Sequence, residues 1–342
     1  MKIAQVAPLF VSVPPPGYGG TERVVSYLTE ELVRQGHDVT LYATGDSNTR
    51  AKLISVRDTT VWDKHSKPIS DIDPLLWHTL HLDRVVQDSA QYDVIHFHMD
   101  VHHLPFTKMI ETPTLTTFHN SLTKPDYDQL FAHFNKHNVV SISNNHQQTL
   151  PMANWAATVY HGIDRNLYSF HEKHEDYFVF VGRVNRDKRP DWAIKIAQGA
   201  GVKLKIAARI EDEEMWEQMQ PLPEGVEYVG EISDVEKNDF IGNAKAMLFP
   251  INWAEPFGMV MIEAMACGVP VIAFNRGSVP EILEDGLTAF IVDNVQEAIV
   301  AAGKLDTLDR HKIRAEFERR FTVETMANQY VRLYEELIKH KL

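Results

Sequence analysis

Short apolar runs alternate with longer segments of helical spacing along nearly the whole chain. The series opens with an apolar run at 3–7, a helical segment at 21–34 and a second apolar run at 38–43. Strands that alternate with helices are typical of a parallel sheet whose crossover connections are helical. The pattern therefore predicts an α/β fold built on doubly wound sheets.

The alternation forms two series separated by a polar stretch, so we predict two Rossmann-like domains. The first would span 1–164, the polar stretch 165–176 would be a linker, and the second domain would span 177–322. Residues 323–342 close the chain and are predicted to form an amphipathic helix that packs on the body. Its apolar stripe consists of Met326, Tyr330, Leu333, Tyr334 and Leu337.

Composition narrows the function classes. The 342 residues include 47 acidic and 34 basic side chains, which gives a net charge of −13. This balance argues against nucleic acid as a partner and against a polybasic membrane anchor. Cys267 is the only cysteine, so an intrachain disulfide and a thiolate metal cage are excluded. Because the sequence shows neither a signal peptide nor a transmembrane segment, we expect a cytoplasmic protein.

A glycine-rich segment follows the first predicted strand and opens a helix. Gly19 and Gly20 would let the backbone approach a ligand, and the free N–H groups of a helix start favour an anion. As a dinucleotide fingerprint the segment is weak, since Glu22 occupies the position of the last glycine. A plain strand-to-helix turn is the alternative.

Histidines are concentrated in the first half of the chain, with 15 of the 17 at or before His174. His96 and His98 would lie on one side of a strand end, but a zinc site needs a third ligand at a recognisable spacing, so we expect no metal. His119 ends an apolar strand at 114–118. Its imidazole could hydrogen-bond a ligand there or serve a structural role.

Two cations follow the first strand of the second predicted domain. Arg183 and Lys188 lie in a strand-to-helix loop of an otherwise acidic chain. Two converging cations are well suited to a diphosphate. A solvated basic loop is the alternative interpretation.

A loop and helix at 253–268 hold two glutamates. Glu263 stands alone in an apolar helical run, and burial of an isolated carboxylate costs several kcal/mol unless a polar partner meets it. That partner could be internal, or it could be a ligand hydroxyl. Glu255 lies in the loop, and the N–H groups after Gly258 open the helix, so hydroxyls and a phosphate could be held together.

Taken in order, these features resemble the retaining glycosyltransferases of family 4, which have the GT-B fold. The most specific element is the pair Glu255 and Glu263, separated by seven residues. Supporting elements are Val181-Gly-Arg183 with Lys188, Gly19-Gly20, the segment 34–40 and Gly162-Ile-Asp164. The resemblance covers essentially the full chain. It implies two facing domains with the acceptor held mainly by the first, the nucleotide-sugar donor held mainly by the second, and a C-terminal helix that crosses back to the first.

The resemblance also assigns roles. It implies a catalytic group of His119, Arg183, Lys188 and Glu255, and a donor-binding group of Gly19, Gly20, Phe257, Gly258, Met259 and Glu263. The two cations would contact the donor diphosphate, Glu263 would hold ribose hydroxyls, and Glu255 and His119 would lie near the transferred sugar. No metal and no cofactor beyond the nucleotide-sugar co-substrate are implied. His161 departs from the family, which usually has asparagine there.

The expected activity is transfer of a hexose, with UDP- or GDP-sugar as the favoured donor, to a small-molecule, glycan or lipid-linked acceptor. We expect a front-face mechanism with retention and without metal. Two alternatives remain at this point: an NAD(P)-dependent oxidoreductase that uses two Rossmann-like halves, and a non-catalytic module that binds a sugar nucleotide. Asp38 and Asp46 lie near the distance at which a dinucleotide site needs an acidic ribose ligand.

Overall fold

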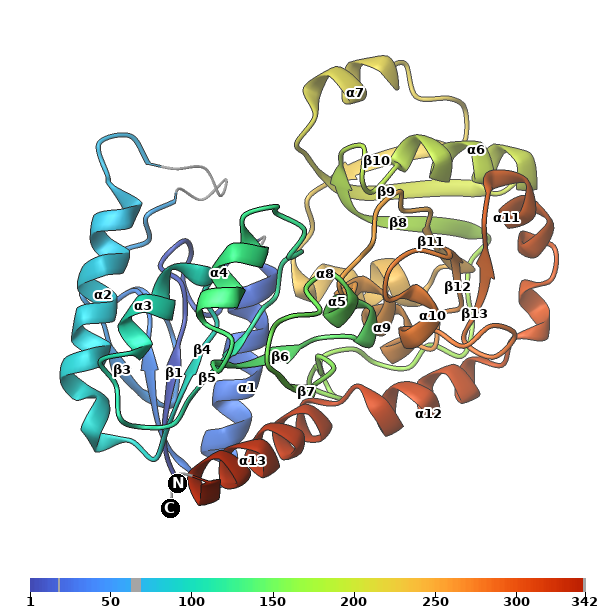
Figure 1. Cartoon of the computed structure of the whole chain (residues 1–342). Helices are drawn as coiled ribbons and strands as arrows, with labels where there is room; N and C mark the ends of the chain where they lie inside the picture. Colours follow the sequence, from blue (N-terminus) through green and yellow to red (C-terminus); the bar gives the residue numbers. More distant parts are fainter. Residues whose placement is uncertain (18, 63–68, 341–342) are drawn as a thin grey trace. The chain divides into compact units, whose positions relative to one another are not determined.

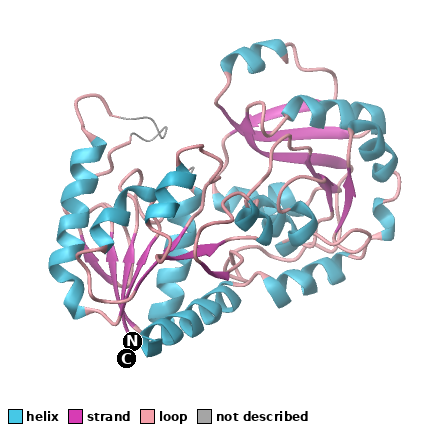
Figure 2. Ribbon diagram, in the orientation of Figure 1, coloured by secondary structure: helices cyan, strands magenta, loops and turns pink. Residues whose placement is uncertain are grey.

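The computed structural model describes residues 1–17, 19–62 and 69–340. The chain divides into two compact units, which are described separately below (Figure 1). Unit 1 comprises residues 1–162 together with 323–342, and unit 2 comprises residues 163–322. Figure 2 shows that each unit is built on a sheet with helices packed around it.

Unit 1 contains a parallel sheet of seven strands in the order β3-β2-β1-β4-β5-β6-β7. The strands are β1 (Lys2–Val6), β2 (Asp38–Tyr42), β3 (Lys52–Ile54), β4 (Val94–Phe97), β5 (Thr114–Thr117), β6 (Asn138–Ser141) and β7 (Trp155–Thr158). β1 and β4 pair in parallel at the centre of the sheet, where Ile3 aligns with Val94 and Val6 with Phe97. These four side chains are fully buried, as expected for central parallel strands covered on both faces.

The helices of unit 1 lie between its strands along the chain, except for the C-terminal helix α13. They are α1 (Gly20–Arg34), α2 (Pro74–Asp88), α3 (Leu104–Thr107), α4 (Tyr127–His133), α5 (Asn144–Gln148) and α13 (Val323–His340), with short 3₁₀ turns at Ser89–Gln91 and Val101–His103. Asp73 caps α2 by accepting hydrogen bonds from the backbone N–H groups of Leu75 and Leu76.

Unit 2 contains a parallel sheet of six strands in the order β10-β9-β8-β11-β12-β13. The strands are β8 (Tyr177–Val184), β9 (Lys203–Ile210), β10 (Val226–Gly230), β11 (Ala246–Phe249), β12 (Val271–Phe274) and β13 (Ala289–Val292). The helices are α6 (Pro190–Ala200), α7 (Glu213–Gln218), α8 (Asp234–Gly242), α9 (Met259–Ala266), α10 (Val279–Ile282), α11 (Val295–Ala302) and α12 (Arg310–Arg320), with a 3₁₀ turn at Leu305–Thr307. The predicted α/β fold with two doubly wound sheets is confirmed.

Both sheets reverse their strand order at one point. The reversal lies between β1 and β4 in unit 1 and between β8 and β11 in unit 2. The crossovers on either side of such a point diverge, which leaves a crevice outside the carboxyl ends of the two strands. The loops that follow these four strands are therefore the expected positions for ligand-binding residues.

The C-terminal helix α13 belongs to unit 1 and contacts α1, as the apolar stripe and the family resemblance predict. Tyr330 and Tyr334 are fully buried, and Met326 is 1% exposed. Gln35 at the end of α1 donates a hydrogen bond of 3.1 Å to the Asn328 side chain. The helix therefore joins the core of unit 1 through apolar packing and through polar contacts.

Two strands, β3 and β13, were not identified from the sequence. β3 has only three residues and lies at the edge of its sheet, where its side chains are exposed or half-buried. β13 is also an edge strand, and its two central residues are half-buried. β3, with the sequence Lys-Leu-Ile, carries a weak apolar run, whereas the four residues of β13 are all apolar.

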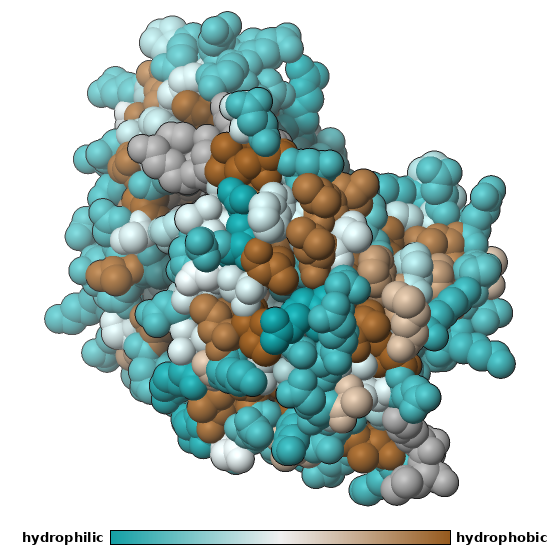
Figure 3. Space-filling model, turned by 90° about the vertical axis from the view of Figure 1, so that its left-hand side faces the viewer, coloured by the Kyte–Doolittle hydropathy of each residue, from teal (hydrophilic) through white to brown (hydrophobic). Residues whose placement is uncertain are grey.

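The surface mixes polar and apolar side chains, as Figure 3 shows for one face. Leu75, Leu76 and Leu80 on α2 are among the exposed apolar residues, at 62%, 52% and 43%. In the described part of the chain, no helix is both long and apolar enough to cross a membrane.

Candidate active site

Lys188 and Glu255 meet in unit 2 beside the reversal point of the sheet. Lys188 follows β8, Glu255 follows β11, and the ammonium group donates a hydrogen bond to the Glu255 Oε2 atom. The ammonium nitrogen also lies 5.2 Å from the ring centroid of Trp253. Both members of the pair are largely buried, with side chains 14% and 10% exposed. Each charge therefore neutralises the other in a partly desolvated setting.

The loop that carries Glu255 is held from several sides. Trp253 Nε1 donates a hydrogen bond of 3.0 Å to Glu255 Oε2. The Ser278 backbone N–H donates to the Glu255 carbonyl at 2.9 Å, and the Ser278 hydroxyl donates to the Phe257 carbonyl at 2.9 Å. A Cβ atom at Gly277 would collide with the Glu255 backbone, so this close approach requires glycine. The carboxylate is thus presented from a rigid loop.

Gly258 begins the helix that follows this loop. It caps α9 in the left-handed conformation, with φ of 83°, and a Cβ atom there would lie 2.6 Å from Met261 Cε. No side chain caps this helix start. The first backbone N–H groups of a helix lack intrahelical partners, so those around Phe257, Gly258 and Met259 suit an anion or a hydroxyl oxygen.

Arg183 lies near the end of β8 and is held by a carboxylate that the sequence analysis did not identify. Its Nη1 atom lies 3.0 Å from both carboxylate oxygens of Glu211, and Asn185 donates to the same carboxylate at 2.6 Å. Partial burial alone would raise the pKa of Glu211, but Asn185 and Arg183 together hold that pKa below its ordinary value. Like Lys188, Arg183 therefore has a counter-ion before any ligand arrives.

Glu263 is 3% exposed in α9, and its partner is internal. The Lys237 ammonium group in α8 lies 3.3 Å from both Glu263 carboxylate oxygens, and it also lies 3.2 Å from Asp234. The structure thus supplies the polar partner that the sequence required. This partner is a cation 26 positions earlier in the chain, which no local spacing rule identifies.

The glycine-rich segment lies at the start of α1 in unit 1. Gly19 is the N-cap and packs against Pro15, whereas a Cβ atom at Gly20 would meet open space. Glu22 is 5% exposed in the first helical turn, and burial raises its pKa to about 7. The turn therefore combines a backbone that a ligand can approach with a buried carboxyl group whose pKa lies near neutral pH.

His119 follows β5, as expected for a residue at the carboxyl edge of the sheet. Its Nε2 atom lies 2.9 Å from His98 Nδ1, and its ring stacks on His161 at a centroid distance of 5.2 Å. Its Nδ1 atom is buried and has no hydrogen-bond partner among the described residues. Burial lowers the pKa of His119 to about 3, so the imidazole is neutral at ordinary pH.

The pair His96 and His98 does not converge on a shared ligand. His96 hydrogen-bonds Tyr334 and Thr117, and His98 hydrogen-bonds His119 and Gln5. Within residues 1–17, 19–62 and 69–340, no group of three or more His, Cys, Asp or Glu side chains is arranged to hold a metal ion.

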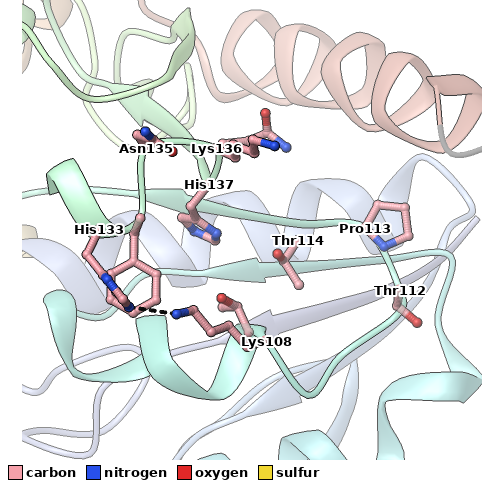
Figure 4. A pocket seen from close by; sticks show the side chains of 11 residues that line it. Lys108, Thr112, Pro113, Thr114, His133, Asn135, Lys136 and His137 are labelled. Carbon is pink, nitrogen blue, oxygen red and sulfur yellow. Dashed lines mark hydrogen bonds between the residues drawn. The ribbon is translucent and has the colours of Figure 1, made fainter. Parts of the chain in front are cut away.

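A pocket of about 420 Å³ in unit 1 lies away from these residues (Figure 4). It is lined in part by Thr114 and Asn138, the first residues of β5 and β6, which places it at the amino ends of these strands. Figure 4 shows Lys108 meeting His133 at one side, and their nitrogen atoms are 2.7 Å apart. None of the site residues predicted from the sequence lines this pocket.

The sequence of the second unit matches the family described as "Glycosyl transferases group 1" over residues 168–320. The first unit matches the family described as "Glycosyltransferase Family 4" over residues 18–167. The chain belongs to glycosyltransferase family 4. It is a glycosyltransferase that uses a nucleotide sugar, so the oxidoreductase and non-catalytic alternatives no longer stand.

Two curated relatives of this glycosyltransferase come from bacteria. The phosphatidyl-myo-inositol mannosyltransferase of Mycobacterium leprae is 24% identical over 377 residues, which cover 98% of this chain and 96% of that protein. An uncharacterised 41.2 kDa protein in the cps region of Klebsiella pneumoniae is 30% identical over 175 residues. That second match spans about half of each protein, 48% of this chain and 47% of the relative.

Solved structures share the fold over the full length. AviGT4, a glycosyltransferase involved in avilamycin A biosynthesis, matches with a TM-score of 0.76 at 20% identity and covers 98% of both chains. The Anabaena protein HepE, in complex with UDP and glucose, matches with a TM-score of 0.72 at 18% identity. That match covers 98% of this chain and 100% of HepE. The GT-B fold expected from the sequence is confirmed.

Proposed function

We propose that this glycosyltransferase moves a hexose from a UDP- or GDP-sugar to an acceptor hydroxyl with retention of the anomeric configuration. Two relatives support the donor class: one is a mannosyltransferase by name, and HepE is described with UDP and glucose. The acceptor is a small molecule, a glycan or a lipid-linked hydroxyl. The mycobacterial relatives are named phosphatidyl-myo-inositol mannosyltransferases, and these names support a lipid-linked acceptor.

The observation that carries the proposal is the Lys188–Glu255 pair beside the reversal point of the second sheet. A donor diphosphate bound there would draw Lys188 and Arg183 from their carboxylate partners. These two cations would balance the charge that builds on the departing diphosphate, a role that a metal fills in other transferases. The backbone N–H groups around Phe257, Gly258 and Met259 would add hydrogen-bond donors at the helix start.

Glu255 is better suited to hold sugar hydroxyls than to attack the anomeric carbon. Its Oε2 atom already accepts hydrogen bonds from Lys188 and Trp253. The hydrogen bond from Trp253 would remain when Lys188 turns to the diphosphate. It makes the carboxylate a weaker nucleophile, because it stabilises the charge before attack. We therefore favour a front-face route. The bond from the anomeric carbon to the phosphate oxygen breaks, the acceptor oxygen bonds to that carbon on the same face, and the phosphate oxygen accepts the proton of the acceptor hydroxyl.

The remaining candidates complete the donor site. Glu263 would accept hydrogen bonds from the ribose hydroxyls, with Lys237 balancing its charge. In unit 1, Gly19 and Gly20 would let the backbone approach the diphosphate. His119 would contact a hydroxyl of the donor sugar near the reacting carbon, which makes it a catalytic residue under this proposal.

A donor panel tests the function. Purified protein is incubated with UDP-, GDP- and ADP-sugars, and released nucleotide is measured with and without candidate acceptors. One UDP- or GDP-hexose should be turned over, Lys188→Met should lose that turnover, and product NMR should show the donor's anomeric configuration. An inverted product, a glycosyl ester trapped on Glu255, or activity that EDTA abolishes and manganese restores would contradict the mechanism.

A further inference from the structure

His119 is the first member of a chain of hydrogen bonds that runs through the interior of unit 1. Its Nε2 atom lies 2.9 Å from Nδ1 of His98, which follows β4. The other ring nitrogen of His98, Nε2, lies 2.6 Å from the side-chain carbonyl oxygen of Gln5 in β1. His98 is 2% exposed and Gln5 is fully buried, so solvent does not compete for these contacts.

The chain of contacts continues to the C-terminal helix. The Gln5 amide nitrogen donates a hydrogen bond of 3.0 Å to the Tyr334 hydroxyl in α13. The same hydroxyl lies 2.7 Å from Nδ1 of His96, a fully buried residue of β4. A residue of the last helix thus supplies a hydrogen-bond acceptor for the end of the Gln5 amide that does not face His98.

The direction of each hydrogen bond follows from what the atoms can donate. The Gln5 carbonyl oxygen carries no hydrogen, so His98 Nε2 must be the donor to it. Burial lowers the pKa of His98 well below its ordinary value, so its ring is neutral and carries one N–H only. Nδ1 of His98 is therefore an acceptor, and His119 Nε2 donates to it. That leaves Nδ1 of the neutral His119 ring without a proton.

We propose that Tyr334 is a positioning residue that, through Gln5 and His98, holds His119 in the Nε2–H tautomer, so that Nδ1 accepts a hydrogen bond from a hydroxyl of the donor sugar. The orphaned, buried Nδ1 atom of His119 is the group this tautomer leaves ready for a ligand. The contact with the sugar rests on the proposed function, whereas the tautomer does not.

The hydrogen bonds of this chain have one alternative arrangement, in which each donor and acceptor is exchanged. If the Gln5 amide were reversed, its nitrogen would donate to His98, and every hydrogen bond along the chain would reverse with it. His119 would then present an Nδ1–H group and would repel the hydroxyl proton that it is proposed to accept. In the arrangement that the structure shows, the Tyr334 hydroxyl accepts from the Gln5 amide nitrogen. Loss of this hydroxyl would leave that buried nitrogen without its acceptor and would weaken the preference for this arrangement.

Nitrogen NMR of the full chain labelled with ¹⁵N-histidine tests the tautomer directly. His119 is assigned from the resonances that vanish in His119→Gln, and its Nδ1 should show the shift of an unprotonated ring nitrogen. In Tyr334→Phe the His119 resonances should move toward those of a mixed tautomer. With the donor found by the panel, kcat should fall roughly tenfold while the donor KM changes little.

Two matched variants separate this role from packing. Tyr42→Phe also removes a buried hydroxyl with two partners in unit 1, Asp88 and Tyr92, but outside the chain of contacts. Tyr330→Phe removes the neighbouring hydroxyl of α13, which contacts Thr117. Tyr42→Phe should leave the His119 tautomer unchanged, and Tyr330→Phe should leave the contact between Gln5 and Tyr334 intact. Gln5→Met is the second test of the chain and should act like Tyr334→Phe, including if Tyr334→Phe does not fold.

The outcomes are distinguishable. A protonated Nδ1 at His119 in the wild-type protein overturns the proposal, as does an unchanged tautomer in both Tyr334→Phe and Gln5→Met. An equal loss of kcat in Tyr330→Phe and Tyr334→Phe would assign the effect to helix docking. If the NMR result holds but no nucleotide sugar is turned over, the proposed function fails while the hydrogen-bond chain stands.

Discussion

The ammonium group of Lys188 is hydrogen-bonded to the carboxylate of Glu255, 67 positions later in the sequence. The cation expected to meet the diphosphate and the glutamate expected to meet the sugar are therefore each other's counter-ions. A bound donor would have to replace one half of this pair without leaving the other half unbalanced. Under the proposed function, donor binding would be coupled to a rearrangement of charge within the loops after β8 and β11.

Lys188→Met should weaken nucleotide binding and also lower stability. It leaves the Glu255 charge in a site where the side chain is 10% exposed, so we expect a loss of about 1 to 3 kcal/mol in the free energy of unfolding. Urea unfolding and calorimetric titration with nucleotide measure the two effects. Adding Glu255→Leu should recover much of the stability but none of the binding. Full recovery of binding in the double variant would show that Lys188 does not contact the diphosphate.

Glu211→Gln should strengthen nucleotide binding. The Glu211 carboxylate competes with the diphosphate for Arg183, and the amide removes its charge while it keeps its shape. Because the Arg183 side chain is 21% exposed, we expect a gain of only a few-fold in affinity, about 0.5 to 1 kcal/mol. Glu214→Gln is the matched control, because Glu214 is an exposed ion-pair partner of Arg186. Weaker binding in Glu211→Gln would mean that the carboxylate orients Arg183 and does not compete for it.

Glu263→Ala should weaken nucleotide binding by about 1.5 to 3 kcal/mol if the carboxylate accepts hydrogen bonds from ribose. It should also destabilise the protein, because Lys237 loses a buried partner. Lys237→Met separates the effects, since it breaks the same ion pair but leaves the carboxylate in place. A collapse of thermal stability with unchanged nucleotide affinity in Glu263→Ala would assign a purely structural role to the pair.

Acid should destabilise the fold over the range in which unfolded histidines gain protons. Burial lowers the pKa to about 3 for His81 and His119 and to about 4 for His137 and His146. In the unfolded chain these groups titrate near pH ~6.5, so the unfolded state binds more protons below that pH. Each would lower the free energy of unfolding by up to about 1.4 kcal/mol per pH unit between roughly 6.5 and 4.

Glu22 acts in the opposite direction, since burial raises its pKa to about 7 and its protonated form favours the folded state as pH falls from there. One carboxyl group offsets one histidine, so the net trend remains a loss of stability in acid. Urea unfolding at several pH values between about 7.5 and 4.5 measures the slope. A flat profile would show that these histidines are solvated.

Much of the fold could be predicted because it depends on local periodicity. Apolar runs bounded by helical segments identified the central strands and the C-terminal helix. The edge strands β3, which has only three residues, and β13, which is short although fully apolar, were missed. The candidate side chains at strand ends could also be located, since the carboxyl edge of a parallel sheet follows directly from strand order.

Local patterns along the chain were enough to predict the fold class, the C-terminal helix and the types of residue at the strand ends. The partners of these residues follow from packing: Glu211 for Arg183, Lys237 for Glu263, and Glu255 for Lys188. The physical reason is that periodicity is set by neighbours in the chain, whereas an ion pair depends on which of many charged residues the packed sheet brings within reach. The contact between Gln5 and Tyr334 joins residues 329 positions apart, and it exists only because α13 packs on unit 1.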